Sequence, residues 1–348
     1  MHRFFPVALS NTARRLGVVL VTSLAAVTLA SCGGGTQAKK FVPESLVVFG
    51  DEFSLVKPNG ATYGINLPIT FNSASRYSCN DFPNWVLYFS AYTLIDFKFP
   101  TECPDWLGAG SKSAVMLAND PGDVRVDNDT SVALAVTNAG VDAVLNTING
   151  NLGILNDRTM VTVSVGRADV VQAYRQFLAS PTSLTALEAN LKELGKRFSR
   201  GLVPIANRGA RIMLLLQPGL GDSPLAKSDS VNLVRNKAAL KALSKSLNQG
   251  IELGASIAGI TGQQLSLVRL DDVMDVVVAN YASYLLNNID AAACVSAQSS
   301  APLCLSTDTL AASDASTTYL WADATHVGPA IQGTFSTYVI SASQRNPF

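Results

Sequence analysis

The stretch SLVVFGDEFS, residues 45–54, decides the fold. Its first half is a continuous apolar run from Ser45 to Phe49, and Gly50-Asp51 then ends the run with residues typical of a turn. Apolar residues in succession, rather than in alternation with polar ones, are typical of a strand that is buried on both faces. We therefore expect a central strand that runs into a loop at Gly50.

Further segments along the chain alternate between the same kind of strand and helices with apolar residues at helical spacing. We expect strands at Val132–Val136, Thr159–Val165, Arg211–Leu216 and Leu265–Leu270. We expect helices near Trp85–Ala91, at Thr185–Phe198, Val231–Gly250 and Val273–Leu286, and from Gly328 towards Ser343. The rest of Lys57–Asp129 reads as mostly irregular. This alternation predicts an α/β fold with a mostly parallel sheet covered by helices on both faces. Ligands of such sheets bind at the carboxyl ends of the strands, here the loops after Phe49, Val165 and Leu216 and the loop that holds His326.

The first residues read as an export signal. A basic start is followed by an apolar run from Leu16 to Leu29, which is too short to span a membrane. The sequence LASCG at residues 29–33 resembles the lipobox of bacterial lipoproteins, in which the cysteine is acylated, for example with palmitate. We expect a signal peptide over 1–31, a flexible tether over 32–44 from lipidated Cys32, and a single domain over 45–348. An ordinary secretory signal is the alternative. Gly33 after the cysteine favours the outer membrane over the inner membrane, by resemblance to other bacterial lipoproteins.

Composition excludes several classes of partner. Basic and acidic residues balance at 26 each, so no electrostatic argument for nucleic acid exists. Four cysteines besides the lipidated one predict two disulfides in an exported chain, and of the three pairings Cys79–Cys103 with Cys294–Cys304 is the simplest. No CxxC spacing indicates zinc, and His326 is the single histidine after the signal, so we expect no metal and no cofactor.

Four segments in order resemble the SGNH, or GDSL, hydrolase family of lipases and esterases. They are VVFGDEFS at 47–54, VTVSVGRAD at 161–169, the segment 209–221 with its strand and PGLG loop, and YLWADATH at 319–326. The family has Gly-Asp-Ser, Gly-x-Asn-Asp and Asp-x-x-His at the first, second and fourth of these places. The resemblance implies a flavodoxin-like three-layer α/β/α sandwich and, through its last segment, a dyad of Asp323 and His326.

The chain departs from the family where the chemistry should occur. Glu52 stands in place of the serine nucleophile, and a carboxylate cannot form the acyl-serine ester. Ala168 stands in place of the oxyanion asparagine in the loop that begins at Gly166, and loss of one such donor typically costs on the order of 10²–10³ in rate. We find no confident match for the family's oxyanion glycine, and residues 135–140 are the nearest candidate.

Other side chains near these motifs have structural explanations that we favour. Glu52 would be a hydrogen-bonded structural carboxylate, paired with His326 if the two meet. Ser54 could replace the serine, but a hydroxyl that caps a helix is the stronger interpretation. Arg167 could pair with Glu52 or bind an anion, but we favour a solvated surface arginine.

Acidic residues near the strand ends have similar explanations. Asp51 and Asp169 would accept hydrogen bonds from backbone groups. The cluster Asp271, Asp272 and Asp275 shows too few convergent oxygens for calcium and reads as the first turn of a helix.

Taken together, these features predict a catalytically impaired lipoprotein of the cell envelope that acts as a binding or structural module. The alternative is an active ester hydrolase that uses Asp323 and His326 with a non-standard nucleophile. Either would meet the membrane through its lipid anchor, and an acyl or glycan ester is the ligand class that the resemblance implies.

Overall fold

The computed structural model describes residues 41–71, 74–97, 112–120, 139–227, 230–295 and 304–345. The chain divides into two units, Met1–Lys40 and Phe41–Phe348, and all described residues belong to the second. The predicted signal peptide, Cys32 and Cys103 therefore lie outside the described residues, as does the strand expected at Val132–Val136.

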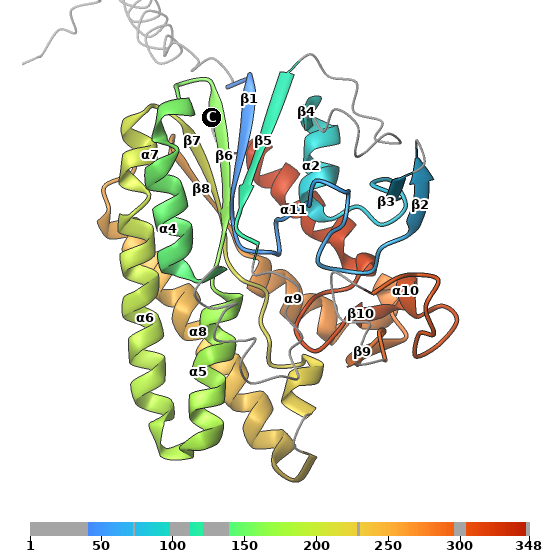
Figure 1. Ribbon diagram of the computed structural model, residues 1–348. Helices are drawn as coiled ribbons and strands as arrows, with labels where there is room; N and C mark the ends of the chain where they lie inside the picture. Colours follow the sequence, from blue (N-terminus) through green and yellow to red (C-terminus); the bar gives the residue numbers. More distant parts are fainter. Residues whose placement is uncertain are drawn as a thin grey trace, which may run out of the picture. The chain divides into compact units, whose positions relative to one another are not determined.

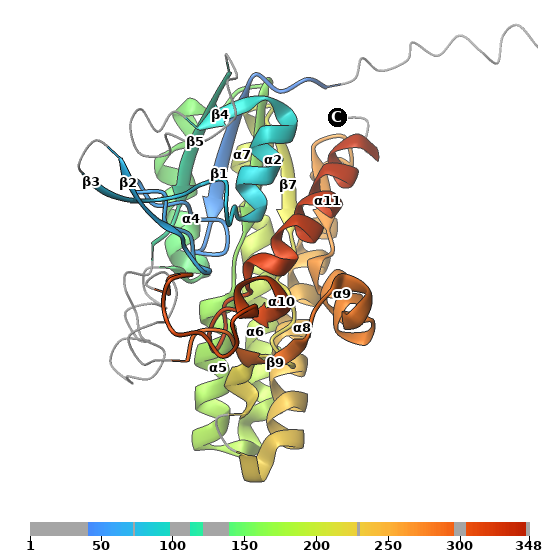
Figure 2. The same ribbon diagram turned by 90° about the vertical axis from the view of Figure 1, so that its right-hand side faces the viewer.

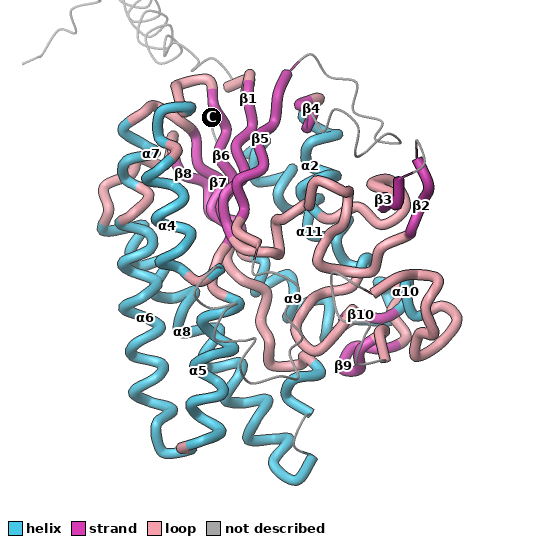
Figure 3. Tube along the Cα trace, in the orientation of Figure 1, coloured by secondary structure: helices cyan, strands magenta, loops and turns pink. Residues whose placement is uncertain are grey.

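A six-stranded parallel sheet forms the centre of this unit (Figure 3). Its spatial order is β4 (Ile95–Phe97), β5 (Lys112–Ala118), β1 (Ser45–Gly50), β6 (Thr159–Ser164), β7 (Arg211–Leu215) and β8 (Leu265–Val268). Leu46, Val48 and Phe49 are fully buried, because β1 lies between two strands and beneath helices on both faces. The predicted α/β fold with a parallel sheet is confirmed. Apart from β4 at the edge, the strand order is the flavodoxin-like one.

Helices cover the sheet on both sides (Figures 1 and 2). One side carries α4 (Val141–Gly150), α5 (Arg167–Ala179), α6 (Leu184–Arg200), α7 (Val203–Asn207) and α8 (Leu233–Ile257). The other carries α2 (Trp85–Thr93) and α11 (Pro329–Arg345), with α9 (Leu270–Ala279) in contact with α11. The apolar stripes of these helices pack onto the sheet and supply most of the core, including the buried rings of Trp85, Tyr174, Phe198 and Phe335.

Smaller elements lie outside the main sheet. Strands β2 (Pro68–Phe71) and β3 (Ala74–Tyr77) pair antiparallel, and β9 (Asn288–Ala292) pairs with β10 (Tyr319–Trp321), which follows the short helix α10 (Ala315–Thr318). Single 3-10 turns complete the described chain at Leu152–Ile154, Pro181–Ser183, Pro224–Lys227, Ser230–Asn232 and Tyr281–Tyr284.

The structure corrects the sequence prediction in the region 57–129. This region was expected to be mostly irregular, but it contributes β5, which pairs directly with β1. The sequence of β5, KSAVMLA, mixes Lys and Ser with small apolar residues, so its apolar run is too short to stand out. Helices α4 and α5 were also not predicted. The helix expected at Val273–Leu286 begins earlier, at Leu270, and ends at Ala279.

One of the two expected disulfides lies within the described residues. Cys294 and Cys304 are bonded, which confirms this pairing. The pairing of Cys79 with Cys103 stays a prediction, because Cys103 lies outside the described residues. Among the helices of the described part, none combines the length and apolar character that crossing a membrane requires.

Candidate functional site

The candidate site lies at the carboxyl end of β1, where the connections to the neighbouring strands leave in opposite directions along the sheet. After β1 the chain crosses to β5 on one side, and later strands lie on the other side beginning with β6. In such sheets the crevice at this point, beyond the carboxyl ends of the strands, is the usual ligand site. Gly50 has φ +133°, and a Cβ there would lie 2.1 Å from the Ser164 carbonyl oxygen. Glycine therefore lets the ends of β1 and β6 approach closely, which brings Asp51 and Glu52 next to Gly166 and Arg167.

Asp51 holds the two strand ends together. Its Oδ2 accepts hydrogen bonds from the backbone N–H of Gly166 (3.1 Å) and from Gln217 Nε2 (2.9 Å), and its Oδ1 accepts from the Phe53 N–H (3.2 Å). Burial, with the neighbouring Glu52 charge, raises the pKa of Asp51 well above its ordinary value. The expectation that Asp51 accepts backbone hydrogen bonds is confirmed. As a result, the Gly166 N–H points at Asp51 and is not free to bind an oxyanion.

Glu52 lies at the centre of the site and is 1% exposed. Its Oε1 forms an ion pair with Arg167 Nε and lies 3.7 Å from His326 Nε2. Burial alone would raise the pKa of Glu52, but the Arg167 charge and the contact with His326 lower it to about 2. Glu52 is therefore a permanent carboxylate at neutral pH, bonded to neighbours as the structural interpretation predicted.

Arg167 contradicts the expectation of a solvated surface residue. It is 8% exposed, and its Nη1 donates to Thr325 Oγ1 at 2.8 Å. Gly166, with φ +120°, turns the chain so that the first residue of α5 faces inward over Glu52. A buried carboxylate is strongly destabilising unless a cation pairs with it. This rule was the available signal, since Arg167 follows the carboxyl end of β6, the strand that lies next to β1.

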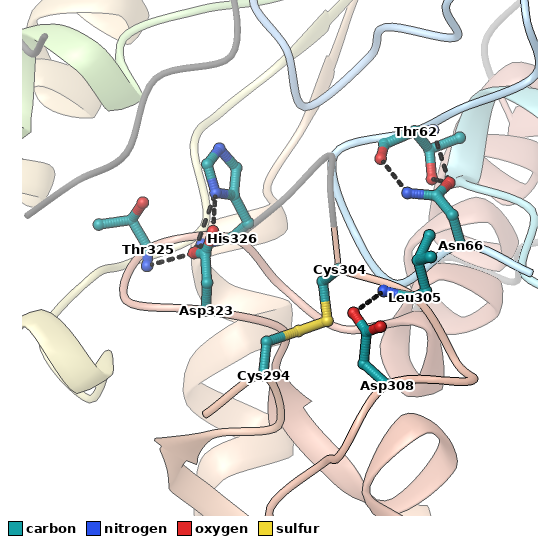
Figure 4. The surroundings of a disulfide bond; sticks show 9 residues. All are labelled: Thr62, Asn66, Cys294, Cys304, Leu305, Asp308, Asp323, Thr325 and His326. Carbon is teal, nitrogen blue, oxygen red and sulfur yellow. Dashed lines mark hydrogen bonds and ion pairs between the residues drawn. A yellow bond between two sulfur atoms is a disulfide. The ribbon is translucent and has the colours of Figure 1, made fainter. Parts of the chain in front are cut away.

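Asp323 and His326 form a hydrogen-bonded dyad in the loop between β10 and α11 (Figure 4). His326 Nδ1 lies 2.9 and 2.8 Å from the two carboxylate oxygens, and Oδ1 also accepts from the backbone N–H of Thr325 (2.9 Å) and His326 (2.8 Å). Burial would raise the pKa of Asp323, but the His326 charge holds it well below its ordinary value. Burial would likewise lower the pKa of His326, but Asp323 raises it overall.

The disulfide supports this loop from below (Figure 4). The Cys294 N–H donates to the Ala322 carbonyl at 2.9 Å, one residue before Asp323. Cys304 accepts from the Asn66 N–H at 2.9 Å. The bond therefore ties the loop that carries the dyad to the segment after β1.

The space in front of His326 is small. The pocket there holds about 20 Å³, and its walls include Phe53, Tyr63, Arg167, Gln217 and Thr325. That volume suits about one water molecule. The Tyr63 ring lies 5.2 Å from the His326 ring, and its hydroxyl donates to Asp120 Oδ1 at 2.8 Å. Tyr63, Gln217 and Thr325 were not predicted as site residues, although Gln217 and Thr325 lie within the segments 209–221 and 319–326.

Two side-chain atoms of the site lack hydrogen-bond partners within the described residues. They are His326 Nε2 and Glu52 Oε2. The Ser54 hydroxyl, which is also fully buried, lacks one as well. Residues 51–54 form a turn rather than a helix start, so the expectation that Ser54 caps a helix is wrong.

The remaining predicted site positions are structural. Ala168 is 3% exposed in the first turn of α5. Gly140 precedes α4 as its N-cap, and residues 135–138 lie outside the described part. Asp169 accepts from the Val141 N–H at 3.1 Å, as expected of a carboxylate that satisfies backbone groups.

The acidic cluster after β8 also behaves as expected. Asp271 and Asp272 lie in the first turn of α9, and Asp275 pairs with Lys241 at 3.0 Å.

No model of a known protein family matches this chain, and no curated protein matches it either.

Proposed function

We propose that this protein is a catalytically silent relative of the SGNH hydrolases that acts as a binding or structural module at the bacterial cell envelope. The observation that carries the proposal is the ion-paired Glu52 at the nucleophile position, held by Arg167 and facing His326.

Three physical reasons oppose ester hydrolysis at this site. A carboxylate whose pKa is about 2 is a weak base, and its pairing with Arg167 withdraws it further from attack on a carbonyl. The N–H of Gly166 is bonded to Asp51, and Ala168 has no side-chain donor, so neither of these two residues supplies a hydrogen bond to an oxyanion. The pocket beside His326 accommodates about one water rather than an ester.

Ester turnover by the purified chain tests this proposal. We expect wild type and His326→Ala to give the same background rate with p-nitrophenyl acetate, butyrate and palmitate. Glu52→Ser should raise the rate only slightly, because Ala168 still supplies no oxyanion donor. The double variant Glu52→Ser with Ala168→Asn should exceed either single change. Wild-type turnover that His326→Ala removes would refute the proposal.

Anchoring at Cys32 is part of the proposal and rests on the LASCG sequence at residues 29–33. Cells that express the chain should yield a membrane-bound protein whose N-terminal peptide begins at an acylated Cys32. Cys32→Ala should shift the protein out of the membrane fraction. An unmodified cysteine within a longer N-terminal peptide would contradict the anchor without affecting the argument on Glu52.

The second candidate is an ester hydrolase with a non-standard nucleophile. It is favoured by one observation, the intact dyad whose Nε2 has no hydrogen-bond partner within the described residues, as is also true of the Ser54 hydroxyl. Under this alternative, Ser54→Ala would abolish turnover as completely as His326→Ala does.

A further inference from the structure

A second concave surface lies at the β8 edge of the sheet, apart from the Glu52 site at the ends of the central strands β1 and β6. It has a volume of about 320 Å³ and lies between the edge strand β8, helix α9 and the last turns of α11. Figure 2 shows α9 beside α11. None of its lining residues belongs to the Glu52–His326 site. We call it the β8 groove, and its residues are Leu267, Val268, Arg269, Asp272, Val273, Val276, Tyr338, Ala342 and Arg345.

The walls of the β8 groove are mainly apolar. Leu267 and Val268 come from the strand, Val273 and Val276 from one face of α9, and Tyr338 from α11. Val276 is 45% exposed and Tyr338 is 40% exposed, so apolar surface is open to solvent there. A volume of roughly 300 Å³ or more, apolar walls and a few polar groups are the usual properties of small-molecule sites.

Two arginines and one aspartate line the groove, and one of the arginines is available to an anion. Arg269 Nε pairs with Asp272 Oδ2 at 2.7 Å, and its Nη1 pairs with Glu252 of α8 at 2.6 Å. Two carboxylates therefore already occupy the Arg269 guanidinium. Arg345 instead donates to the Ser341 hydroxyl at 3.0 Å, and no carboxylate of the described residues forms an ion pair with it. Among the described residues that line the groove, Arg345 is the one charged side chain without an ion-pair partner.

We propose that the β8 groove binds a long-chain carboxylate, with the aliphatic chain along β8 and α9 and the carboxylate on Arg345. An apolar chain replaces water against Val273, Val276 and Tyr338. A carboxylate can accept two parallel hydrogen bonds from a guanidinium. This inference does not rest on the proposed function, since the two sites share no residue.

Fluorescence titration with 11-(dansylamino)undecanoic acid and the purified full-length chain tests the proposal. We expect saturable enhancement with a dissociation constant on the order of micromolar. Ala342→Trp fills the groove and should weaken binding by about tenfold or more. Thr337→Trp is the matched control, because Thr337 is exposed on the same helix and does not line the groove, and it should bind as wild type.

The headgroup contact has its own test. Arg345→Ala should weaken the acid by about threefold to fivefold, as expected for an exposed ion pair, while Arg345→Lys retains most of the affinity. The methyl ester of the probe should bind equally to wild type and Arg345→Ala.

Several outcomes would overturn the proposal. They are absence of saturable binding, insensitivity to Ala342→Trp, and an equal effect of Arg345→Ala on acid and ester. Binding only to phosphatidylglycerol vesicles would instead identify a membrane surface. A dimer in sedimentation that Ala342→Trp dissociates would identify a second copy of the chain as the occupant.

Discussion

Replacing Arg167 by methionine should destabilise the fold strongly and change how its stability depends on pH. Methionine keeps much of the side-chain length but leaves Glu52 buried beside His326 without its cation. The pKa of Glu52 falls from 4.5 to about 2 on folding. Since each unit of pKa is worth about 1.4 kcal/mol, the partners of Glu52 stabilise the folded state by about 3 kcal/mol at neutral pH.

Removal of one partner of a buried ion pair typically costs 3–5 kcal/mol, roughly the same magnitude. We therefore expect Arg167→Met to lose about 3–5 kcal/mol at pH 7, which corresponds to a fall of about 6–15 °C in Tm. Glu52→Gln with Arg167→Met should recover most of the loss, because no charge then remains buried in the pair.

The stabilities of wild type and Arg167→Met should change with pH in opposite directions. In wild type the pKa of Glu52 is lowered, so its stabilisation is complete above about pH 4.5 and is lost as pH falls towards 2. In Arg167→Met, burial raises the pKa of Glu52 above 4.5. Stability is instead lost as pH rises from about 4.5 through the raised pKa of the folded state. The defect of the variant should therefore be larger at pH 7 than at pH 4.

Urea denaturation of wild type, both single variants and the double variant at pH 4 and pH 7 measures these quantities. A loss below about 0.5 kcal/mol for Arg167→Met would refute the reasoning, because that is the range of neutral surface substitutions. So would a defect that is equal at both pH values.

Three further predictions follow from the same site and its supports. Asp323→Asn should lower the pKa of His326 below its ordinary value, because burial then acts without the carboxylate. An NMR titration of the His326 ring protons measures this pKa, and a titration unchanged from wild type would contradict the dyad. Since the folded pKa of His326 is raised, the stability it contributes in wild type is present below about pH 6.5 and is lost as pH rises through the folded value. Cys294→Ala with Cys304→Ala should cost about 2–3 kcal/mol in urea denaturation, as expected for a loop closed across ten residues, whereas reduction of wild type with no effect would speak against the bond. Burial raises the pKa of Asp169 to about 7, so wild type should lose stability as pH rises from 4 through 7, and Asp169→Asn should flatten this decline; a parallel decline in the variant would assign it to another group.

The parallel sheet was predictable because β1 and β7 contain continuous apolar runs and β6 is rich in β-branched residues. Val47 and Leu214 have only apolar neighbours, and the one polar residue beside Val161 is the β-branched Thr162. β5 was missed for the opposite reason. Its Lys112 and exposed Val115 lie in a strand that helices cover less fully, so its sequence pattern is mixed.

The candidate site was predictable in its motifs but not in its charge balance. The positions of Glu52, Asp323 and His326 follow from short local patterns. The burial of Arg167 depends on the turn at Gly166 and on a carboxylate 115 residues earlier in the chain. Tyr63 and Gln217 reach the site through loops, where sequence spacing carries no information on distance.

Labelling with a fluorophosphonate, followed by intact mass measurement, tests the central claim most directly. Such a reagent bonds covalently to a serine that a histidine activates. We predict no adduct on wild type after prolonged incubation, because Glu52 occupies the place that faces His326 Nε2. A single stoichiometric adduct on a serine, abolished by His326→Ala, would contradict the account and identify a working nucleophile.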